Sequence, residues 1–161
     1  MPPGDENSNY GMAKRALLDR LERPPAAVHR IEGERGKDAA AHAYEQELGE
    51  TPLDLLLLGI GPDGHVASLF PGKPAIDETS RRVVGTDPGL EPWVDRVTLT
   101  LPVLRSANEI LFVVSGDAKA DAVRRAFGEE PSVETPASLV RAASGRTVAI
   151  LDRAAAAAIE A

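Results

Sequence analysis

Short apolar runs alternate with amphipathic segments along the chain. Four leucines at 55–58 stand between Pro52 and Gly59, and a second apolar run, EILFVVSG, covers 109–116. Short continuous apolar runs bracketed in this way predict strands buried on both faces, as in a parallel sheet. Strict alternation in RVTLTL predicts a half-buried strand over 96–101. Further strands are predicted at 81–86 and 146–152, and a weaker one at 27–31.

Apolar residues at helical spacing predict helices between these strands. The first covers 8–22, with Ser8 as its amino-terminal cap and Pro24 and Pro25 after its end. A second covers 38–49 and ends at Gly49. We expect further helical segments at 67–70, 101–108, 117–127, 136–143 and 154–161. Strands that alternate with helices predict an α/β fold with a largely parallel sheet.

The composition is that of a soluble globular protein. The 161 residues suffice for one domain with a real core, so we expect a single α/β domain over 1–161. Hydrophobic residues make up 43% and charged residues 27%. The net charge of −7 predicts no nucleic-acid or anionic-membrane surface. The chain has no cysteine, which excludes disulfides and thiolate zinc sites. It has no secretory signal pattern and no apolar stretch near the roughly 20 residues of a spanning helix, so a cytoplasmic location is expected.

The segment LGIGPDGHVASLFPG, residues 58–72, carries the candidate chemistry. Gly59 and Gly61 allow a tight turn and close approach to a ligand, and Asp63-Gly64 is a strong turn dipeptide. His65 is the type of side chain best suited to accept a proton near neutral pH. The loop follows a predicted strand, and ligands of α/β sheets bind at the carboxyl ends of strands. This combination indicates a functional site.

Each part of this segment also has a plainer interpretation. The two glycines lack the third glycine of the dinucleotide fingerprint, and PDG alone is a generic turn. A lone loop histidine is more often structural or solvated than catalytic. Asp63 either orients His65 or only caps the turn. If a helix begins after His65, backbone N–H groups there would favour an anion or a developing oxyanion.

GIGPDGHVASLFPG closely resembles the signature of the 6-phosphogluconolactonases. Further segments similar to that family follow in the same order along nearly the whole chain: SNYGMAKRALLD (8–19), DRVTLTLPVL (95–104), VVSGDAKADAV (113–123), TPASLV (135–140) and ILDRAAA (150–156). Glucosamine-6-phosphate deaminases share the fold and a similar Gly-x-Asp-Gly-His loop. Their histidine is typically followed by an Ala-Phe-Asn-Glu-Pro type of sequence, whereas VASLFPG follows His65 here. The resemblance therefore favours the lactonases.

This resemblance implies a Rossmann-like three-layer sandwich of the type found in NagB, RpiA and CoA transferases. It also implies hydrolysis of 6-phospho-D-glucono-1,5-lactone to 6-phospho-D-gluconate in the oxidative pentose phosphate pathway. His65 would be the general base and Asp63 its partner. Gly59, Gly61 and Gly64 would bind the substrate, and N–H groups around Gly61 and Gly64 would stabilise the tetrahedral oxyanion. Neither a cofactor nor a metal is implied, because a lactone is already an activated ester.

The phosphate of such a substrate needs cations. Lys119, after Gly116 at the start of a predicted helix, is the first candidate, and Arg96 is the second. Either could instead be a solvated or surface-paired charge. Ser68 and Asn9 are weaker candidates, as hydrogen-bond donors or merely as helix caps. The expected partner is thus a small sugar-phosphate lactone, and the expected state is a monomer or a weak homodimer.

The chain departs from the family pattern in two places. Many members carry a substrate-binding lysine before the Arg-Val-Thr strand, but TDPGLEPWVDR has none and places Glu91 near that position. A first strand with a Gly-Gly turn and an Asp-Glu-Arg motif would also be expected before SNYG. We therefore expect missing amino-terminal strands, from a start codon assigned too far downstream. Two other functions stay open: a glucosamine-6-phosphate deaminase-like enzyme, and a catalytically impaired fragment that binds sugar phosphates.

Overall fold

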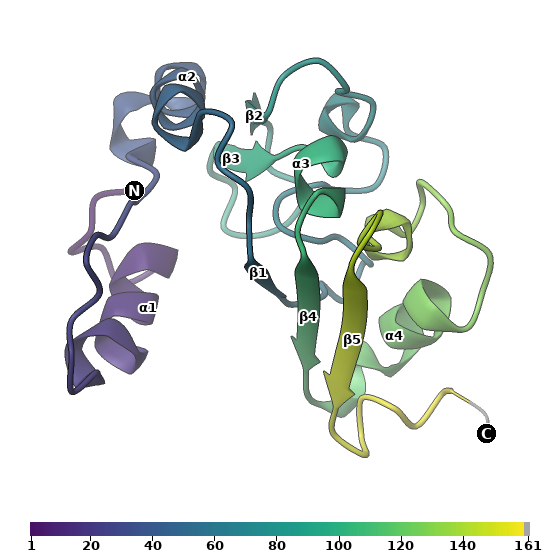
Figure 1. The fold of residues 1–161 in the computed structure, drawn as a ribbon. Coiled ribbons are helices and arrows are strands. Elements are labelled where there is room, and N and C mark those ends of the chain that lie inside the picture. Colours follow the sequence, from purple (N-terminus) through teal and green to yellow (C-terminus); the bar gives the residue numbers. More distant parts are fainter. Residues whose placement is uncertain (160–161) are drawn as a thin grey trace.

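A three-stranded parallel sheet forms the centre of the molecule (Figure 1). The computed structural model describes residues 1–159. The sheet order is β1 (Leu55–Leu58), β4 (Glu109–Val114) and β5 (Arg146–Leu151), with β4 between the other two. In register, Leu57 lies opposite Leu111, and Leu111 lies opposite Val148. The α/β fold with a parallel sheet is confirmed.

A separate two-stranded antiparallel sheet consists of β2 (Val83–Thr86) and β3 (Arg96–Leu99). Helix α2 (Lys37–Leu48) is tied to it through the Glu45 carboxylate, which accepts hydrogen bonds from the Arg81 guanidinium and from the N–H groups of Arg82 and Val83. Burial raises the pKa of Glu45, but these hydrogen bonds outweigh it and hold that pKa below its ordinary value. The carboxylate therefore fixes the start of β2 against α2.

The remaining helices are short. They are α1 (Asn9–Ala16), α3 (Leu101–Arg105) and α4 (Ala120–Phe127), with 3₁₀ turns at Leu18–Arg20, Gly33–Arg35, Pro74–Ile76, Asp117–Lys119 and Pro136–Leu139. Ser8 caps α1, since its Oγ accepts a hydrogen bond from the Gly11 N–H at 3.1 Å. The predicted helix over 8–22 is wrong beyond Ala16. Leu17 and Leu21 are 52% and 42% exposed, so no packed surface supports a longer amphipathic helix.

Two further predictions at the ends of the chain are wrong. Residues 27–31 form no strand. This segment is held by α2 instead, through His29 Nδ1 and Glu47 Oε1 at 2.6 Å, and has no strand neighbour with which to form a ladder. Residues 154–159 form hydrogen-bonded turns rather than a helix, because helix propensity alone cannot stabilise so short a segment. The rest of that prediction, 160–161, lies outside the described residues.

The hydrophobic core lies on one face of the parallel sheet. Ile110, Phe112 and Val114 of β4 point into it and are 0–5% exposed. Phe112 also meets Phe127 of α4 edge to face, with ring centroids 5.3 Å apart. On this side the sheet is covered by α4 and by the segment 136–140. Their fully buried residues are Ala122 and Val123 in α4, and Ala137 and Val140 in the second segment.

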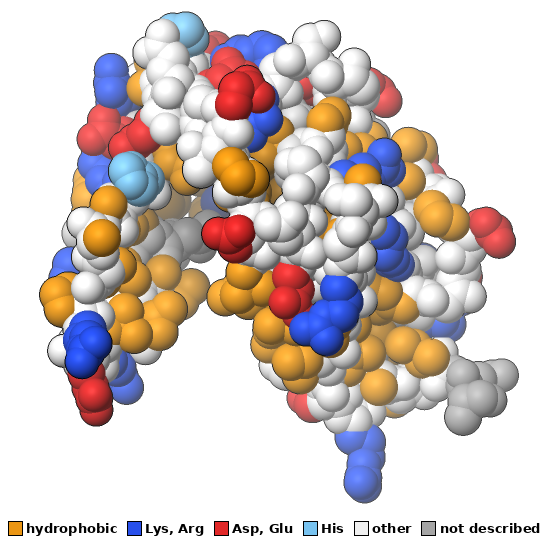
Figure 2. All heavy atoms as spheres, in the orientation of Figure 1, with side chains coloured by type: hydrophobic (Ala, Val, Ile, Leu, Met, Phe, Trp, Pro, Cys, Tyr) orange, Lys and Arg blue, Asp and Glu red, His pale blue; other side chains and the backbone are white. Residues whose placement is uncertain are grey.

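The opposite sheet face is exposed in the described part of the chain. Leu55 and Leu57 of β1 are 53% and 59% exposed, and Val113 and Ile150 of β4 and β5 are 55% and 54% exposed. The prediction that 55–58 is buried on both faces is therefore wrong: only Leu56 and Leu58 pack against the core. Figure 2 shows hydrophobic side chains gathered over the parallel sheet. It also shows a hollow between them and the side of the molecule where Figure 1 places α1.

Candidate functional site

The glycine-rich loop leaves the carboxyl end of β1 and folds back on itself. The Gly61 N–H donates to the His65 carbonyl at 2.9 Å, and the Gly64 N–H donates to the Gly61 carbonyl at 2.9 Å. Gly64 has φ +91°, a conformation that favours glycine. These bonds close the loop around residues 61–65, so that Asp63 and His65 project from one tight turn.

Asp63 and His65 form a hydrogen-bonded pair. Asp63 Oδ1 lies 2.6 Å from His65 Nδ1, and the same oxygen accepts the His65 backbone N–H at 3.1 Å. The two alternatives for Asp63 are thus both realised in geometry, because one carboxylate oxygen caps the turn and contacts the ring. The Nε2 atom of His65 makes no hydrogen bond within residues 1–159, and the side chain is 21% exposed. The Phe70 ring packs beside the imidazole, with centroids 4.5 Å apart.

Gly61 lies directly beneath this pair. A Cβ atom on Gly61 would overlap the imidazole of His65 and stand 2.5 Å from Asp63 Oδ1. Side chains other than hydrogen are therefore excluded at Gly61 by the pair itself. Gly59, by contrast, is exposed and has open space around its Cα. We predicted from the sequence that both glycines allow a tight turn and a close approach to a ligand. Of the two, only Gly61 stands where a side chain would clash.

The expected oxyanion role of Gly61 and Gly64 is not supported by their hydrogen bonds. Both N–H groups donate within the loop, so neither is directed at a ligand. The expected helix at 67–70 is also wrong. Val66 and Leu69 pair across a tight turn in which Ala67 has φ +52°, and the Ser68 N–H donates to Thr98 Oγ1 at 3.1 Å. The loop is attached to β3 at this point and has no helix amino terminus to offer an anion.

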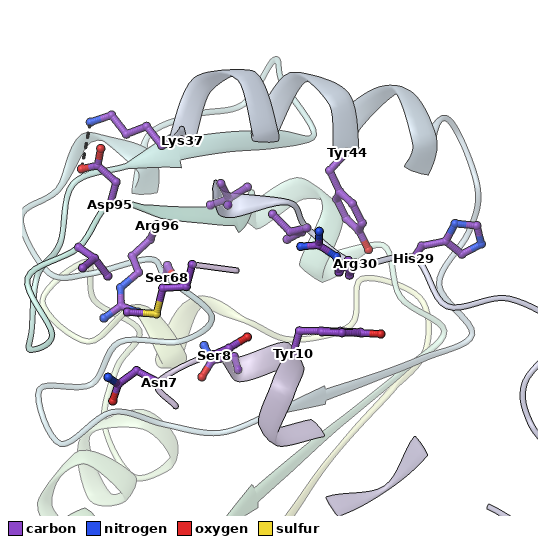
Figure 3. A pocket seen from close by; sticks show the side chains of 16 residues that line it. Asn7, Ser8, Tyr10, His29, Arg30, Lys37, Tyr44, Ser68, Asp95 and Arg96 are labelled. Carbon is purple, nitrogen blue, oxygen red and sulfur yellow. Dashed lines mark ion pairs between the residues drawn. The ribbon is translucent and has the colours of Figure 1, made fainter. Parts of the chain in front are cut away.

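Three predicted residues, Asn9, Ser68 and Arg96, line one pocket of about 330 Å³ (Figure 3). The Arg96 guanidinium donates through Nη2 to the Pro92 carbonyl at 2.9 Å, while its Nε is buried and without a partner among the described residues. His65 does not line this pocket. Ser68, which does line it, follows His65 by three residues in the same loop.

Two cations of this pocket escaped the sequence interpretation. Lys37, at the start of α2, forms ion pairs with Asp87 and with Asp95, the latter at 3.8 Å (Figure 3). Its hydrogen bond with Asp87 raises the pKa of Lys37. Arg30 pairs with Glu34 and lies over the Tyr10 ring, 5.8 Å from its centroid. In the sequence both residues belong to the charged segment 30–37, which no motif links to Ser68 or Arg96. The fold brings all four residues to one pocket.

Lys119 does not line this pocket. It follows Gly116 at the carboxyl end of β4, and β4 runs parallel to β1, so its loop leaves the same sheet edge as the His65 loop. The amide groups expected to join it are already engaged. Gly116 N–H donates to the Asp152 carboxylate at 3.0 Å, and Ala118 N–H donates to Asp117 Oδ1 at 2.8 Å. The N–H groups of Gly116 and Ala118 are therefore not directed at an anion beside Lys119.

Known proteins identify the family. Residues 1–149 match the family model described as glucosamine-6-phosphate isomerases/6-phosphogluconolactonase. The chain belongs to this family. A 6-phosphogluconolactonase of Mycobacterium leprae is 44% identical over 151 residues, which cover 86% of this chain and 61% of that protein. The chain thus spans less than two thirds of the length of that relative.

Solved structures of the family share the fold. The crystal structure of devB protein superposes with a TM-score of 0.87 at 34% identity, covering 99% of this chain and 70% of that one. A monomeric glucosamine-6-phosphate deaminase, described as a missing link of the NagB superfamily, superposes with a TM-score of 0.81 at 25% identity, covering 98% and 70%. The NagB-like α/β fold expected from the resemblance is confirmed.

Two further findings concern residues 1–159. Nowhere in this range do three His, Asp or Glu side chains group in a way that could hold a metal ion. None of the helices in the same range has the length and apolarity needed to cross a bilayer.

Proposed function

We propose that this protein hydrolyses 6-phospho-D-glucono-1,5-lactone to 6-phospho-D-gluconate. The observation that carries the proposal is the His65–Asp63 pair. His65 Nδ1 lies 2.6 Å from Asp63 Oδ1, and Nε2 has no partner within residues 1–159, so it can bind a water molecule. An imidazole held in this way is the arrangement expected of a general base. Membership of a family that includes the lactonases supplies the substrate class.

In the proposed reaction His65 Nε2 takes a proton from a water molecule as its oxygen attacks the lactone carbonyl. Asp63 Oδ1 accepts the Nδ1–H hydrogen bond, fixes the tautomer and stabilises the imidazolium that forms. The tetrahedral intermediate then collapses, the bond to the ring oxygen breaks, and the imidazolium returns its proton to that oxygen. Water is consumed, and the carboxylic acid and a hydroxyl group are the products.

The phosphate group of the substrate is assigned to the two predicted cations, Arg96 and Lys119. Arg96 is supported by its buried Nε, which has no hydrogen-bond partner within residues 1–159, and by its place in the pocket that Ser68 and Asn9 also line. Lys119 is supported by its position in the 3₁₀ turn that follows β4, the strand parallel to β1. Guanidinium and ammonium groups bind phosphate by charge-assisted hydrogen bonds. Gly61 and Gly64 act in this proposal through the shape of the loop, whereas Gly59 has open space around its Cα and is not required for that shape.

A direct assay tests the proposal. The purified chain is expected to accelerate the loss of 6-phospho-D-glucono-1,5-lactone above its spontaneous hydrolysis, measured by coupling the product to an excess of its NADP-dependent dehydrogenase. A rate equal to the uncatalysed background, at protein concentrations where the fold is verified by circular dichroism, would contradict it.

The family description also includes enzymes that act on glucosamine 6-phosphate, so deamination is the second candidate. Incubation with glucosamine 6-phosphate is expected to release no ammonia above a blank. Ammonia release together with lactone hydrolysis at background would reverse the assignment.

A further inference from the structure

The back of the catalytic loop is held by hydrogen bonds from outside the loop. Three consecutive carbonyl groups, those of residues 62, 63 and 64, accept them. The guanidinium of Arg125 on α4 donates through Nη2 to the Pro62 carbonyl at 3.3 Å and through Nη1 to the Asp63 carbonyl at 3.4 Å. The Ala137 N–H donates to the Gly64 carbonyl at 3.0 Å. The loop is therefore attached to two segments far away in the sequence.

Arg125 is itself fixed in place. Its Nε donates to Asp121 one helical turn earlier at 2.9 Å, and its Nη1 donates to Thr135 Oγ1 at 2.7 Å. The side chain is 24% exposed, so these bonds are only partly open to competition from water. A planar guanidinium presents several donors in a rigid fork, which an ammonium group cannot reproduce. The four acceptors around Arg125 suit this geometry.

The backbone of the loop packs closely against Arg125 and Thr135 at Gly64. A Cβ on Gly64 would lie 3.1 Å from Arg125 Nη1 and 3.0 Å from Thr135 Cγ2. The backbone of Asp63 and Gly64 thus lies against Arg125 and Thr135. The carboxylate of the same Asp63 contacts His65 Nδ1 on the other side of the loop. A shift of this backbone would move the aspartate relative to the imidazole.

We propose that Arg125 is a positioning residue that fixes the Asp63–His65 pair by holding the carbonyls of residues 62 and 63. The catalytic part of this inference rests on the proposed lactone hydrolysis. Misplacement of a catalytic group by about 1 Å can cost about 10²-fold in rate. We expect loss of Arg125 to act on the chemical step, because the hydrogen bonds of its guanidinium go to the loop carbonyls, to Asp121 and to Thr135.

The test compares Arg125→Met and Arg125→Lys with the same changes at Arg124. Arg124 is the neighbouring residue on α4, and its guanidinium donates to the carboxylates of Asp121 and Glu129. Both Arg125 variants are expected to lower kcat for lactone hydrolysis at least 10-fold with KM within about 3-fold, and both Arg124 variants are expected to keep the wild-type values. Lys is included because it keeps the charge and the helix but not the fork.

Hydrogen exchange provides a readout that does not depend on activity. The N–H groups of Gly64 and His65 are bound inside the loop, to the Gly61 carbonyl and Asp63 Oδ1. In both Arg125 variants these two amides should exchange at least 10-fold faster, while the Phe112 amide in the core strand β4 should not change. This result would support the inference even if the wild type failed to hydrolyse the lactone, which would count only against the proposed function. Unchanged loop exchange in Arg125→Met, or equal effects of the Arg124 and Arg125 variants, would overturn it.

Discussion

Replacement of His65 by Asn should remove almost all catalysis by this protein. Asparagine has a similar size and can still donate an amide N–H to the Asp63 carboxylate, but it cannot take a proton from water. General-base catalysis contributes about 10²–10⁴-fold, so kcat/KM for the lactone should fall by that factor. The change is measured from initial rates after subtraction of spontaneous hydrolysis.

His42→Asn is the matched control for this substitution. His42 is exposed on α2, where its Nε2 lies 3.1 Å from the side-chain amide nitrogen of Gln46. Its replacement should leave kcat/KM unchanged. Asp63→Asn should fall between the two, because the imidazole keeps its position in the loop but loses the carboxylate that stabilises its charged form. Equal rates for wild type and His65→Asn would exclude His65 as the base.

Gly61→Ala should be nearly as damaging, although alanine adds only one methyl group. The new Cβ would occupy the space of the His65 ring and approach Asp63 Oδ1, so the pair must separate or tilt. Displacement of this kind is expected to lower kcat by about 10²-fold. Measurement of kcat together with the melting temperature separates this local effect from unfolding.

Gly59→Ala is the control that isolates sterics from the general effect of losing a glycine. Gly59 has open space around its Cα and does not adopt the left-handed backbone conformation. The substitution should leave kcat within about 2-fold and change stability by less than about 1 kcal/mol. Equal activity of Gly59→Ala and Gly61→Ala would show that the close approach of Gly61 to Asp63 and His65 does not affect catalysis.

Local sequence patterns predicted most of the strands and the position of the loop. The leucines at 55–58, the run after Glu109 and the alternation after Arg96 all became strands within two or three residues of their expected bounds. The candidate pair, Asp63 and His65, was also identified, because both residues lie within one short turn after a strand. Interactions this local depend on few other parts of the chain.

Long-range features could not be predicted in the same way. A run of leucines does not reveal whether a neighbour covers each face, and Leu57 is in fact 59% exposed. The segment 67–70 has helical composition, yet its backbone follows the hydrogen bond from Ser68 to Thr98, a residue 30 positions away. Arg125 is 62 positions from Asp63, and no motif links the two. Only the packing of α4 against the loop brings them together.

Nitrogen NMR of the three histidines tests the central claim most directly, namely that His65 presents a free Nε2 to the substrate. In the protein labelled with ¹⁵N-histidine, a long-range spectrum at pH 8 should show His65 with its proton on Nδ1. Addition of 6-phospho-D-gluconate should shift the Nε2 signal of His65 and leave that of His42 in place. A His65 ring protonated only on Nε2, with signals that do not respond to this ligand, would contradict the account.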